Sequence, residues 1–400
     1  MADCADEDLP GPRPRLRQSV ARVSGVILET LNAATRGTIV LAIDGLGWEP
    51  ARSAWTRARM RCLTSTFPST SVTAWMTALT GIDPSRHLGI GMVYRLPRLD
   101  CVVHVISNRR VTFTPEQEGD RPPPWDDHEV IIPHHTLFQR AGALGVRCVA
   151  LGRDIDRLAS PWASALLCGA ERPVVSDLRR GRRPDGAIAD PKTFTDTVIG
   201  ETGSTLRAHR GDRSLLVWVY VNLDDHIHLH GYDGVIHQLL QRLETAALTW
   251  ADRRWTVLAH GDHGQTPCRQ DDSLRAVWRR FESPAYCRLP SGGAGRVRWL
   301  YPKSHLQARM MNLLSEGLGD HAMVVSPDEL AERGLLRLTP ALRQRIGEVV
   351  AVAATAEFPV PNPRLRSDHG ALTKDEMLVP LATWPAATAS RRTRSRGEPS

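Results

Sequence analysis

The chain has 400 residues, of which 42% are hydrophobic, and 51 Lys and Arg against 44 Asp and Glu give it a formal net charge of +7. This length supplies a large core, and it fits either several domains or one α/β domain with a smaller insertion. Because no run of about 18 apolar residues occurs along the chain, a membrane span is not expected.

The N-terminal segment, residues 1–18, is acidic and then rich in Pro and Arg, and it lacks the apolar stretch of a signal peptide. Seven cysteines are scattered along the chain without a CxxC pair. An odd number at such spacings fits neither a disulfide framework nor a thiolate zinc site. We therefore expect reduced thiols in a cytoplasmic protein, and the Arg- and Ala-rich composition favours a bacterial one.

The first half of the chain predicts alternating helices and strands. Residues 19–34 fit a helix, and the apolar run GTIVLAIDGLG (37–47) fits a buried strand that ends in an acidic turn. The segment VTAWMTALTG has helical spacing and ends at Gly81, a plausible C-cap. Residues 136–152 read as helix, turn and strand.

The second half continues this alternation and then interrupts it. Residues 214–224 form a second buried strand with an acidic end, 235–251 an amphipathic helix, and 255–264 a strand and turn. Strands that alternate with helices predict a mostly parallel α/β sheet with helices on both faces. We assign residues 37–264 and 367–385 to the main α/β domain and 265–366 to a small α+β cap, which includes a helix near 304–317. Residues 1–36 form a partly disordered extension, and residues 386–400 form a disordered tail.

Arginines cluster twice, in a central run and in the C-terminal tail: Arg179, Arg180, Arg182, Arg183, Arg391, Arg392, Arg394 and Arg396. Such runs are typical of solvated loops, although they can also attract an anionic substrate or nucleic acid. No aromatic residues alternate with these arginines, so a nucleic-acid stacking surface is not supported.

Four distant segments carry metal-ligand residue types: LAIDGLG (41–47), LDDHIHLHG (223–231), AHGDHG (259–264) and SDHG (367–370). Three of them follow a predicted strand, and sites in such sheets form at the carboxyl ends of strands. Asp224 and His228 lie four residues apart, so one helical turn would present both on one face. Asp225, His226, His230 and His260 are rival ligands on sequence grounds alone.

Hydroxyl side chains precede the helix that starts near Val72: Ser69, Thr70 and Ser71. A hydroxyl at a helix N-terminus is usually a cap. The same position favours a phosphate, because free backbone N–H groups point outward there. Beside a metal pair, one of these hydroxyls becomes a credible nucleophile, because a cation lowers the pKa of a hydroxyl.

Taken together and in this order, the segments resemble the type I phosphodiesterase/nucleotide pyrophosphatase family of the alkaline phosphatase superfamily. The resemblance rests on VLAIDGLG, on FPSTS followed by LTGIDPSRH, on the D-x-x-x-H-x-x-G spacing from Asp224, on DHG at 262–264, and on HGALTKDEMLVPL (369–381). Two positions depart from the pattern, His260 and Ala371, and neither removes a ligand. A sulfatase is not expected, because no C-x-P-x-R or S-x-P-x-R motif occurs at the nucleophile position.

The resemblance implies roles for individual residues. One divalent ion would be held by Asp224, His228 and His369, and a second by Asp44, Asp262 and His263. Ser71 would be the nucleophile, with Thr70 as the alternative. Zinc is the expected ion and manganese is the alternative, because the ligand set contains nitrogen and oxygen without thiolate.

The expected function is metal-dependent hydrolysis of a phosphodiester or pyrophosphate bond in a small phosphorylated metabolite or nucleotide, through a phospho-enzyme at Ser71. A phosphomonoesterase and a phosphonate hydrolase are alternatives on the same site, and a metal-stabilised binding protein is the non-enzymatic one. Clustered Arg or Lys near the metals would favour a terminal phosphate, whereas an apolar slot with Trp48 or Trp75 would favour an aromatic group. The natural substrate and the oligomeric state stay open.

Overall fold

The structure is a computed structural model of the full chain, and it describes residues 19–34, 36–114, 125–152, 154–155, 158–174, 180–210 and 214–385. The predicted N-terminal and C-terminal disordered segments lie outside these residues, as do Arg179 and the arginines of the tail. Within the described residues, no helix is both long enough and apolar enough to cross a bilayer.

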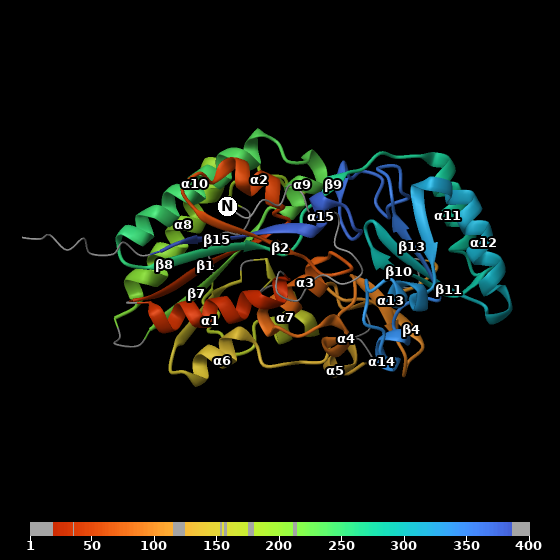
Figure 1. The fold of residues 1–400 in the computed structure, drawn as a ribbon, viewed down its shortest axis with the longest axis horizontal. Helices are drawn as coiled ribbons and strands as arrows, with labels where there is room; N and C mark the ends of the chain where they lie inside the picture. Colours follow the sequence, from red (N-terminus) through yellow and green to blue (C-terminus); the bar gives the residue numbers. More distant parts are fainter. Residues whose placement is uncertain are drawn as a thin grey trace, which may run out of the picture.

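A six-stranded sheet forms the larger part of the molecule, with strand order β2-β15-β8-β1-β7-β6 (Figure 1). Its strands are β1 (Gly37–Asp44), β2 (Arg59–Thr64), β6 (Arg147–Leu151), β7 (Leu215–Asn222), β8 (Thr256–Gly261) and β15 (Leu378–Trp384). β8, β1, β7 and β6 pair in parallel, whereas β15 is antiparallel to both β8 and β2. The predicted mostly parallel α/β sheet is confirmed.

Helices cover both faces of this sheet because its central strands are apolar on both sides. Alternate residues of β1 belong to different cores: Ile39 and Leu41 to one, Val40 and Ala42 to the other. Figure 1 shows one layer above the sheet and a second layer below it. The upper layer contains α2 (Trp48–Ala54), α8 (Pro191–Ala208) and α10 (Gly234–Asp252), and the lower layer α1 (Val23–Ala33), α3 (Ser71–Thr80), α6 (Leu137–Ala143) and α7 (Pro161–Leu166).

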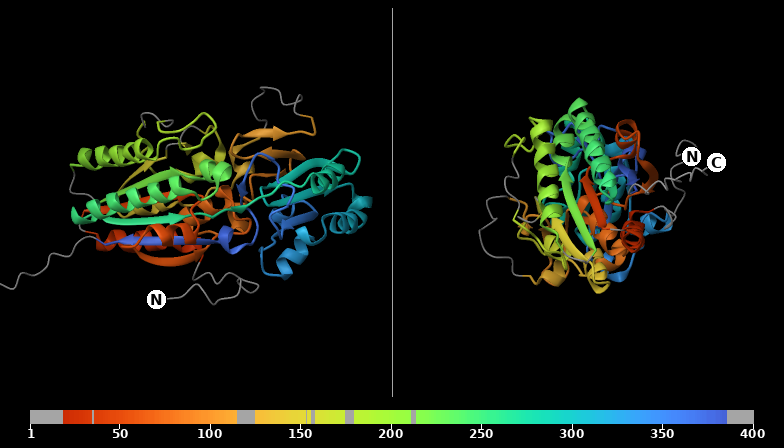
Figure 2. Two further views of the ribbon diagram at one scale, coloured as in Figure 1. Left: turned by 90° about the horizontal axis from the view of Figure 1, so that it is seen from above. Right: turned by 90° about the vertical axis from the view of Figure 1, so that its left-hand side faces the viewer.

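A seven-stranded sheet lies beside the first one, at the right of Figure 1, in the order β12-β13-β11-β10-β3-β4-β5. Its strands are β3 (Val93–Leu96), β4 (Cys101–His104), β5 (Arg109–Val111), β10 (Cys287–Ala294), β11 (Val297–Pro302), β12 (Ala322–Val325) and β13 (Val349–Ala353). The helices α11 (Asp272–Phe281) and α12 (Gln307–Leu318) lie at its outer end (Figure 2). Three of its strands, β3, β4 and β5, lie within residues 93–111, upstream of the predicted cap. The domain boundaries given above remain a prediction.

The carboxyl ends of β1, β7 and β8 face this second sheet. The turn between β10 and β11 of that sheet contacts the segment SDHG (367–370). A Cβ atom added at Gly295, which joins β10 to β11, would lie 2.2 Å from the carbonyl oxygen of His369 and 2.4 Å from Asp368 Oδ1. Only glycine permits this approach, which is further favoured by its φ of +50°. The second sheet is thus fitted against the residues expected to bind metal.

Candidate metal centre

The first sheet brings the predicted ligands together through its strand order. β1 pairs with both β7 and β8, so the residues that end or follow these strands share one edge. Asp44 is the last residue of β1, Asp224 opens the short helix α9 (Asp224–His230) after β7, and Asp262 follows β8. Gly45 allows this closeness, because a Cβ there would lie 2.9 Å from Asp224 Oδ1.

The first group consists of Asp44, Asp262 and His263, whose ligand atoms all lie within 4.8 Å of one another. His263 Nε2 is 3.6 Å from Asp44 Oδ1 and 3.3 Å from Asp262 Oδ2. Ser71 joins this group, since its Oγ lies 3.2 Å from Asp44 Oδ1 and 3.1 Å from His263 Nε2. The predicted nucleophile therefore contacts two predicted ligands.

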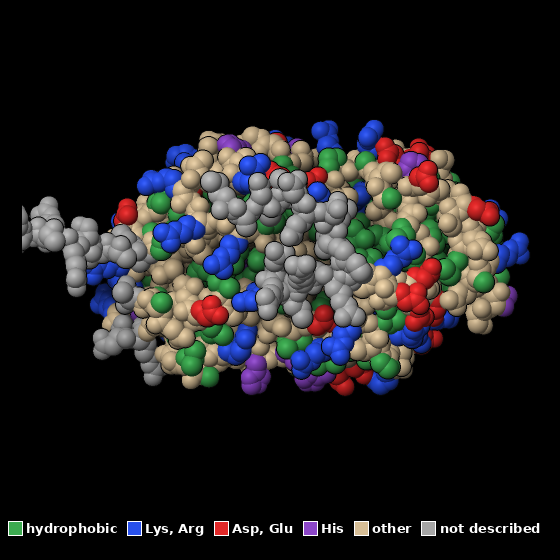
Figure 3. All heavy atoms as spheres, in the orientation of Figure 1, with side chains coloured by type: hydrophobic (Ala, Val, Ile, Leu, Met, Phe, Trp, Pro, Cys, Tyr) green, Lys and Arg blue, Asp and Glu red, His purple; other side chains and the backbone are tan. Residues whose placement is uncertain are grey.

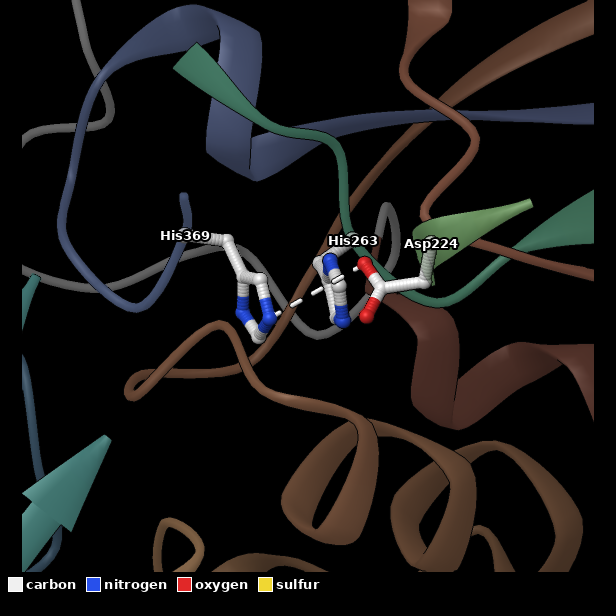
Figure 4. A group of neighbouring side chains, drawn as sticks. All are labelled: Asp224, His263 and His369. Carbon is white, nitrogen blue, oxygen red and sulfur yellow. Dashed lines mark ion pairs between the residues drawn. The ribbon is translucent and has the colours of Figure 1, made fainter. Parts of the chain in front are cut away.

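Asp224 contacts both of the other ligands predicted for the second position, His228 and His369. Asp224 Oδ2 is 3.1 Å from His228 Nε2, and Asp224 Oδ1 is 3.9 Å from His369 Nε2. Figure 4 shows Asp224, His263 and His369 converging from three segments, and their ligand atoms also lie within 4.8 Å of one another. The two positions are thus adjacent and form one centre.

The orientation of the imidazole rings follows from their hydrogen bonds to carbonyl oxygens. His228 Nδ1 lies 2.8 Å from Ser367 O, and His369 Nδ1 lies 2.8 Å from Ser69 O. His263 Nδ1 lies 3.1 Å from Gly264 O. A carbonyl oxygen can only accept, so each Nδ1 carries a proton and each ring is turned with its Nε2 toward the carboxylates.

Burial and mutual repulsion perturb the carboxylates. Burial, and then the charge of Asp224, raises the pKa of Asp44 to about 7. Burial followed by the charges of Asp44 and Asp224 raises the pKa of Asp262 well above its usual range. Burial would also raise the pKa of Asp224, but the neighbouring His228 outweighs it and holds that pKa low. The centre therefore gathers more negative charge than its own side chains neutralise.

One oxygen shows that a divalent cation fits this centre. Asp262 Oδ1 accepts a hydrogen bond from Gly45 N at 3.1 Å, whereas Asp262 Oδ2 is fully buried and accepts none. A buried carboxylate oxygen without a partner is costly unless a cation binds it. Carboxylate oxygens and imidazole nitrogens are ligands that zinc and manganese both accept.

Two residues that sequence reasoning missed also belong to the centre. Asp368 is buried, and its carboxylate lies within 4.8 Å of ligand atoms of His228 and His369. Tyr220, from β7, donates a hydrogen bond to Asp44 Oδ2. Asp368 precedes His369 in SDHG and could have been noticed there, but no local signal marks Tyr220.

The rival residues have other partners. Asp225 contacts Asn222 and Arg182, and His226 contacts the N-cap residue Asp233. His260 is buried with its ring 5.2 Å from that of Trp75.

Thr70, the alternative nucleophile, contacts Thr73 Oγ1 at 3.0 Å. It occupies the N-cap position of α3 without capping the helix through its side chain. This geometry favours Ser71 over Thr70.

A cavity of about 660 Å³ opens above the centre, between the first and second sheets. Its floor includes Ser71, Asp44, Asp224, His228 and His369. Arg298 is the one Arg or Lys among the described residues that line it, and Arg298 is bound to Glu282 at 2.9 Å. Figure 3 shows hydrophobic side chains recessed in the region between the two sheets.

The two tryptophans considered from the sequence are not part of this cavity. Trp75 is completely buried, and Trp48 lines a different hollow beside α10. The tryptophan that does line it is Trp162, from α7.

A buried serine beside two clusters of Asp and His at the carboxyl edge of a mostly parallel sheet defines a phosphoryl-transfer class of site. Residues 38–371 match the family described as type I phosphodiesterase/nucleotide pyrophosphatase, and the chain belongs to that family. It is therefore an enzyme of the phosphoric ester hydrolase class, in a family of metal-dependent hydrolases.

Solved structures support the same fold. Phosphonoacetate hydrolase from Sinorhizobium meliloti, in complex with phosphonoacetate, superposes with a TM-score of 0.60 at 17% identity, covering 90% of this chain and 93% of that one. Murine ectonucleotide pyrophosphatase/phosphodiesterase 5 gives a TM-score of 0.57 at 15% identity, covering 87% of this chain and 88% of that one. An inactive form of the murine protein was solved in complex with AMP. No curated protein sequence matches the chain.

Proposed function

We propose that the protein is a phosphodiesterase that uses Ser71 as its nucleophile and two divalent ions held by the six predicted ligands. The observation that carries this proposal is the position of Ser71 Oγ, within 3.2 Å of Asp44 Oδ1 and 3.1 Å of His263 Nε2, facing the cavity. Asp224, His228 and His369 would hold one ion, and Asp44, Asp262 and His263 the other. When bound, such ions lower the pKa of a coordinated hydroxyl and offset charge on the phosphoryl oxygens.

The side chains of the protein set up the attack in this proposal. Ser71 occupies the first position of α3, where free backbone N–H groups and the helix dipole favour an incoming phosphate. Its hydrogen bond to Asp44 fixes the direction of Oγ. Attack on phosphorus forms the Ser71 Oγ–P bond, the bond from phosphorus to the leaving alcohol breaks, and water then hydrolyses the phosphoserine.

The charge of the cavity favours a diester over a monoester. A diester carries one negative charge at phosphorus, whereas a monoester or a carboxylated phosphonate carries more. Apart from the predicted ligands, the described lining contains Asp154, Asp225, Glu282 and Asp368 but only the paired Arg298. A second substrate anion would therefore lack a cation to meet it.

The test compares hydrolysis of bis-4-nitrophenyl phosphate and 4-nitrophenyl phosphate by the zinc-loaded protein, with Ser71→Ala and Thr70→Ala beside the wild type. We expect faster diester cleavage, a loss of at least about a thousandfold in kcat for Ser71→Ala, and little change for Thr70→Ala. Metal analysis of each variant shows whether the ions remain. Full activity of Ser71→Ala would exclude this nucleophile, and faster monoester cleavage would support the phosphatase alternative.

The metal is tested separately. We propose zinc, with manganese as the alternative, at two ions per chain. Metal content after purification and activity after re-addition of each ion to the metal-free protein distinguish them. A cytoplasmic location stays a prediction.

A further inference from the structure

One wall of the active-site cavity is aliphatic. Its side chains come from β3, β5, the loops beside them and the segment between β6 and α7: Met92, Val93, Ile106, Val111, Ile155 and Leu158. All of them except Ile155 are half-buried, although they pack against the core on their other side. Each therefore keeps apolar surface that a bound ligand can cover.

This wall continues outward from the metal centre. A second hollow of about 550 Å³ shares Ile106, Val111 and Leu158 with the first and reaches Arg109 and Ala159 at its outer end. The two hollows therefore adjoin along the same aliphatic side chains. The groove that these side chains form in the cavity leaves room for a substituent larger than the phosphoryl group itself.

The described lining offers no Trp, Tyr or Phe face to a base. Trp162 is 1% exposed, and its indole N–H donates to Val72 O at 3.2 Å. Tyr220 is 4% exposed, and its hydroxyl contacts Asp44. Since neither ring presents a surface on which a base could stack, this lining suits an aliphatic group better than a nucleoside.

We propose that the substrate is a phosphodiester with an aliphatic alcohol on phosphorus, and that this alcohol lies in the groove formed by Ile106, Val111 and Leu158. The inference rests on the proposed phosphodiesterase function and names its substrate class. Water leaves both the chain and the wall on binding, and each methylene that becomes buried contributes roughly fourfold to affinity. A nucleoside substituent would leave the apolar surface of the wall exposed to water. The polar groups of the nucleoside would also lack hydrogen-bond partners there.

Hydrolysis of such a diester takes two displacement steps at phosphorus, and the alcohol other than the aliphatic one is the leaving group of the first step. With a 4-nitrophenyl diester, the Ser71 hydroxyl gives up its proton to solvent, Oγ forms a bond to phosphorus, and the P–O bond to the nitrophenol breaks. Nitrophenolate leaves with the electron pair, and the alkyl phosphate stays on Ser71. Water then forms a P–O bond, the Ser71 Oγ–P bond breaks, the serine recovers its proton, and a monoalkyl phosphate is released.

The experiment uses three 4-nitrophenyl diesters that differ only in the second alcohol: methyl, hexyl and 5′-thymidyl. We expect kcat/KM of the zinc-loaded enzyme to rise at least about tenfold from methyl to hexyl, and the hexyl ester to exceed the thymidyl ester. Ile106→Asn should remove most of the hexyl preference. Ile132→Asn is the matched control, because Ile132 is exposed and outside the cavity. Thermal unfolding of both variants, and the milder Ile106→Ala, control for misfolding.

The outcomes separate the two proposals. Equal rates for methyl and hexyl esters, both lost in Ser71→Ala, would overturn the aliphatic inference and leave the phosphodiesterase function standing. If no diester is cleaved, calorimetric binding of monohexyl phosphate, monomethyl phosphate and AMP to the zinc-loaded protein still decides the inference. Tighter binding of the hexyl compound supports it, and tighter binding of AMP contradicts it.

Discussion

At the scale of single residues, Tyr220 is the side chain that fixes Asp44. Its buried hydroxyl donates to Asp44 Oδ2, while Asp44 Oδ1 accepts from Ser71. We expect Tyr220→Phe to weaken metal binding by about tenfold to a hundredfold, because outer partners of ligands orient them. Titration of the metal-free protein with zinc measures this change.

The control for that substitution is Tyr94→Phe. Tyr94 is equally buried and donates to the carbonyl of Val130, away from the predicted ligands. The Tyr94→Phe variant should be less stable than the wild type but should bind zinc with the same affinity. Equal zinc affinities for Tyr220→Phe and the wild type would show that the hydroxyl does not position Asp44.

The burial of His87 should make the stability of the protein depend on pH, independently of the predicted metal ligands. It is completely buried, its Nδ1 accepts from Gly89 N at 3.1 Å, and its Nε2 lies 3.1 Å from Thr77 Oγ1. Burial, and then the charges of His134 and Arg345, lower its pKa from 6.5 to about 3. Between these pH values the unfolded chain binds a proton that the folded chain excludes, so stability is lost as the pH falls.

The corresponding measurement compares unfolding free energies of wild type and His87→Asn from pH 7 to pH 4.5. The variant should be less stable at pH 7. Its stability should fall less steeply on acidification, by up to about 1.4 kcal/mol per pH unit. Parallel curves for the two proteins would mean that the pKa of His87 does not differ between the folded and unfolded states.

At the scale of elements, the helix α15 (Lys374–Met377) ties the ligand loops to the second sheet. Glu376 is fully buried, pairs with Arg296 at 3.2 Å and accepts from Ala371 N at 2.8 Å. The backbone of Arg296 donates to His369 O at 2.8 Å, and the carbonyl of Glu376 accepts from Gly264 N at 2.9 Å. One buried ion pair thus borders the loops of both His369 and His263.

Breaking this pair should destabilise the protein strongly. Arg296→Met leaves the Glu376 carboxylate buried without its cation, and we expect a loss of about 3–5 kcal/mol. The double variant Arg296→Met/Glu376→Gln should recover part of that loss, because the uncompensated charge is gone. Denaturant unfolding of the zinc-loaded proteins measures both. A single variant as stable as the wild type would show that solvent reaches Glu376.

The elements also show what local sequence can and cannot predict. β1, β7, β8, α3 and α10 were expected from apolar runs and helical spacing, and the structure confirms them. Pairing between distant strands leaves no such pattern. Val93 pairs with Gly293, although 199 residues separate them along the chain, and this pair joins β3 to β10. For the same reason the aliphatic groove, whose wall comes from β3 and β5, could not be predicted.

At the scale of the whole molecule, the fold assembles a buried negative site that it must stabilise. Asp44, Asp224 and Asp262 approach one another from the ends of three parallel strands, and burial followed by mutual repulsion raises the pKa of Asp44 and of Asp262. Binding of ions to the folded state alone adds about 4 kcal/mol at a thousandfold excess over Kd. Removal of metal by a chelator should therefore lower the melting temperature by roughly 5 °C for each ion lost, at about 1.2 °C per kcal/mol for a chain of 400 residues.

The substitution Asp262→Asn distinguishes two effects on stability: the repulsion between Asp262 and Asp44, and the loss of a metal ligand. This variant replaces a buried carboxyl group whose Oδ2 accepts no hydrogen bond within the described residues. In the chelator-treated state it should melt above the wild type, because repulsion with Asp44 is relieved. With zinc present it should melt below the wild type, because one ligand is lost. Such a crossing of the two melting temperatures would be the signature of a site that gives up stability for ion binding. A variant that melts below the wild type in both states would instead show that Asp262 stabilises the fold through its contact with Gly45 N.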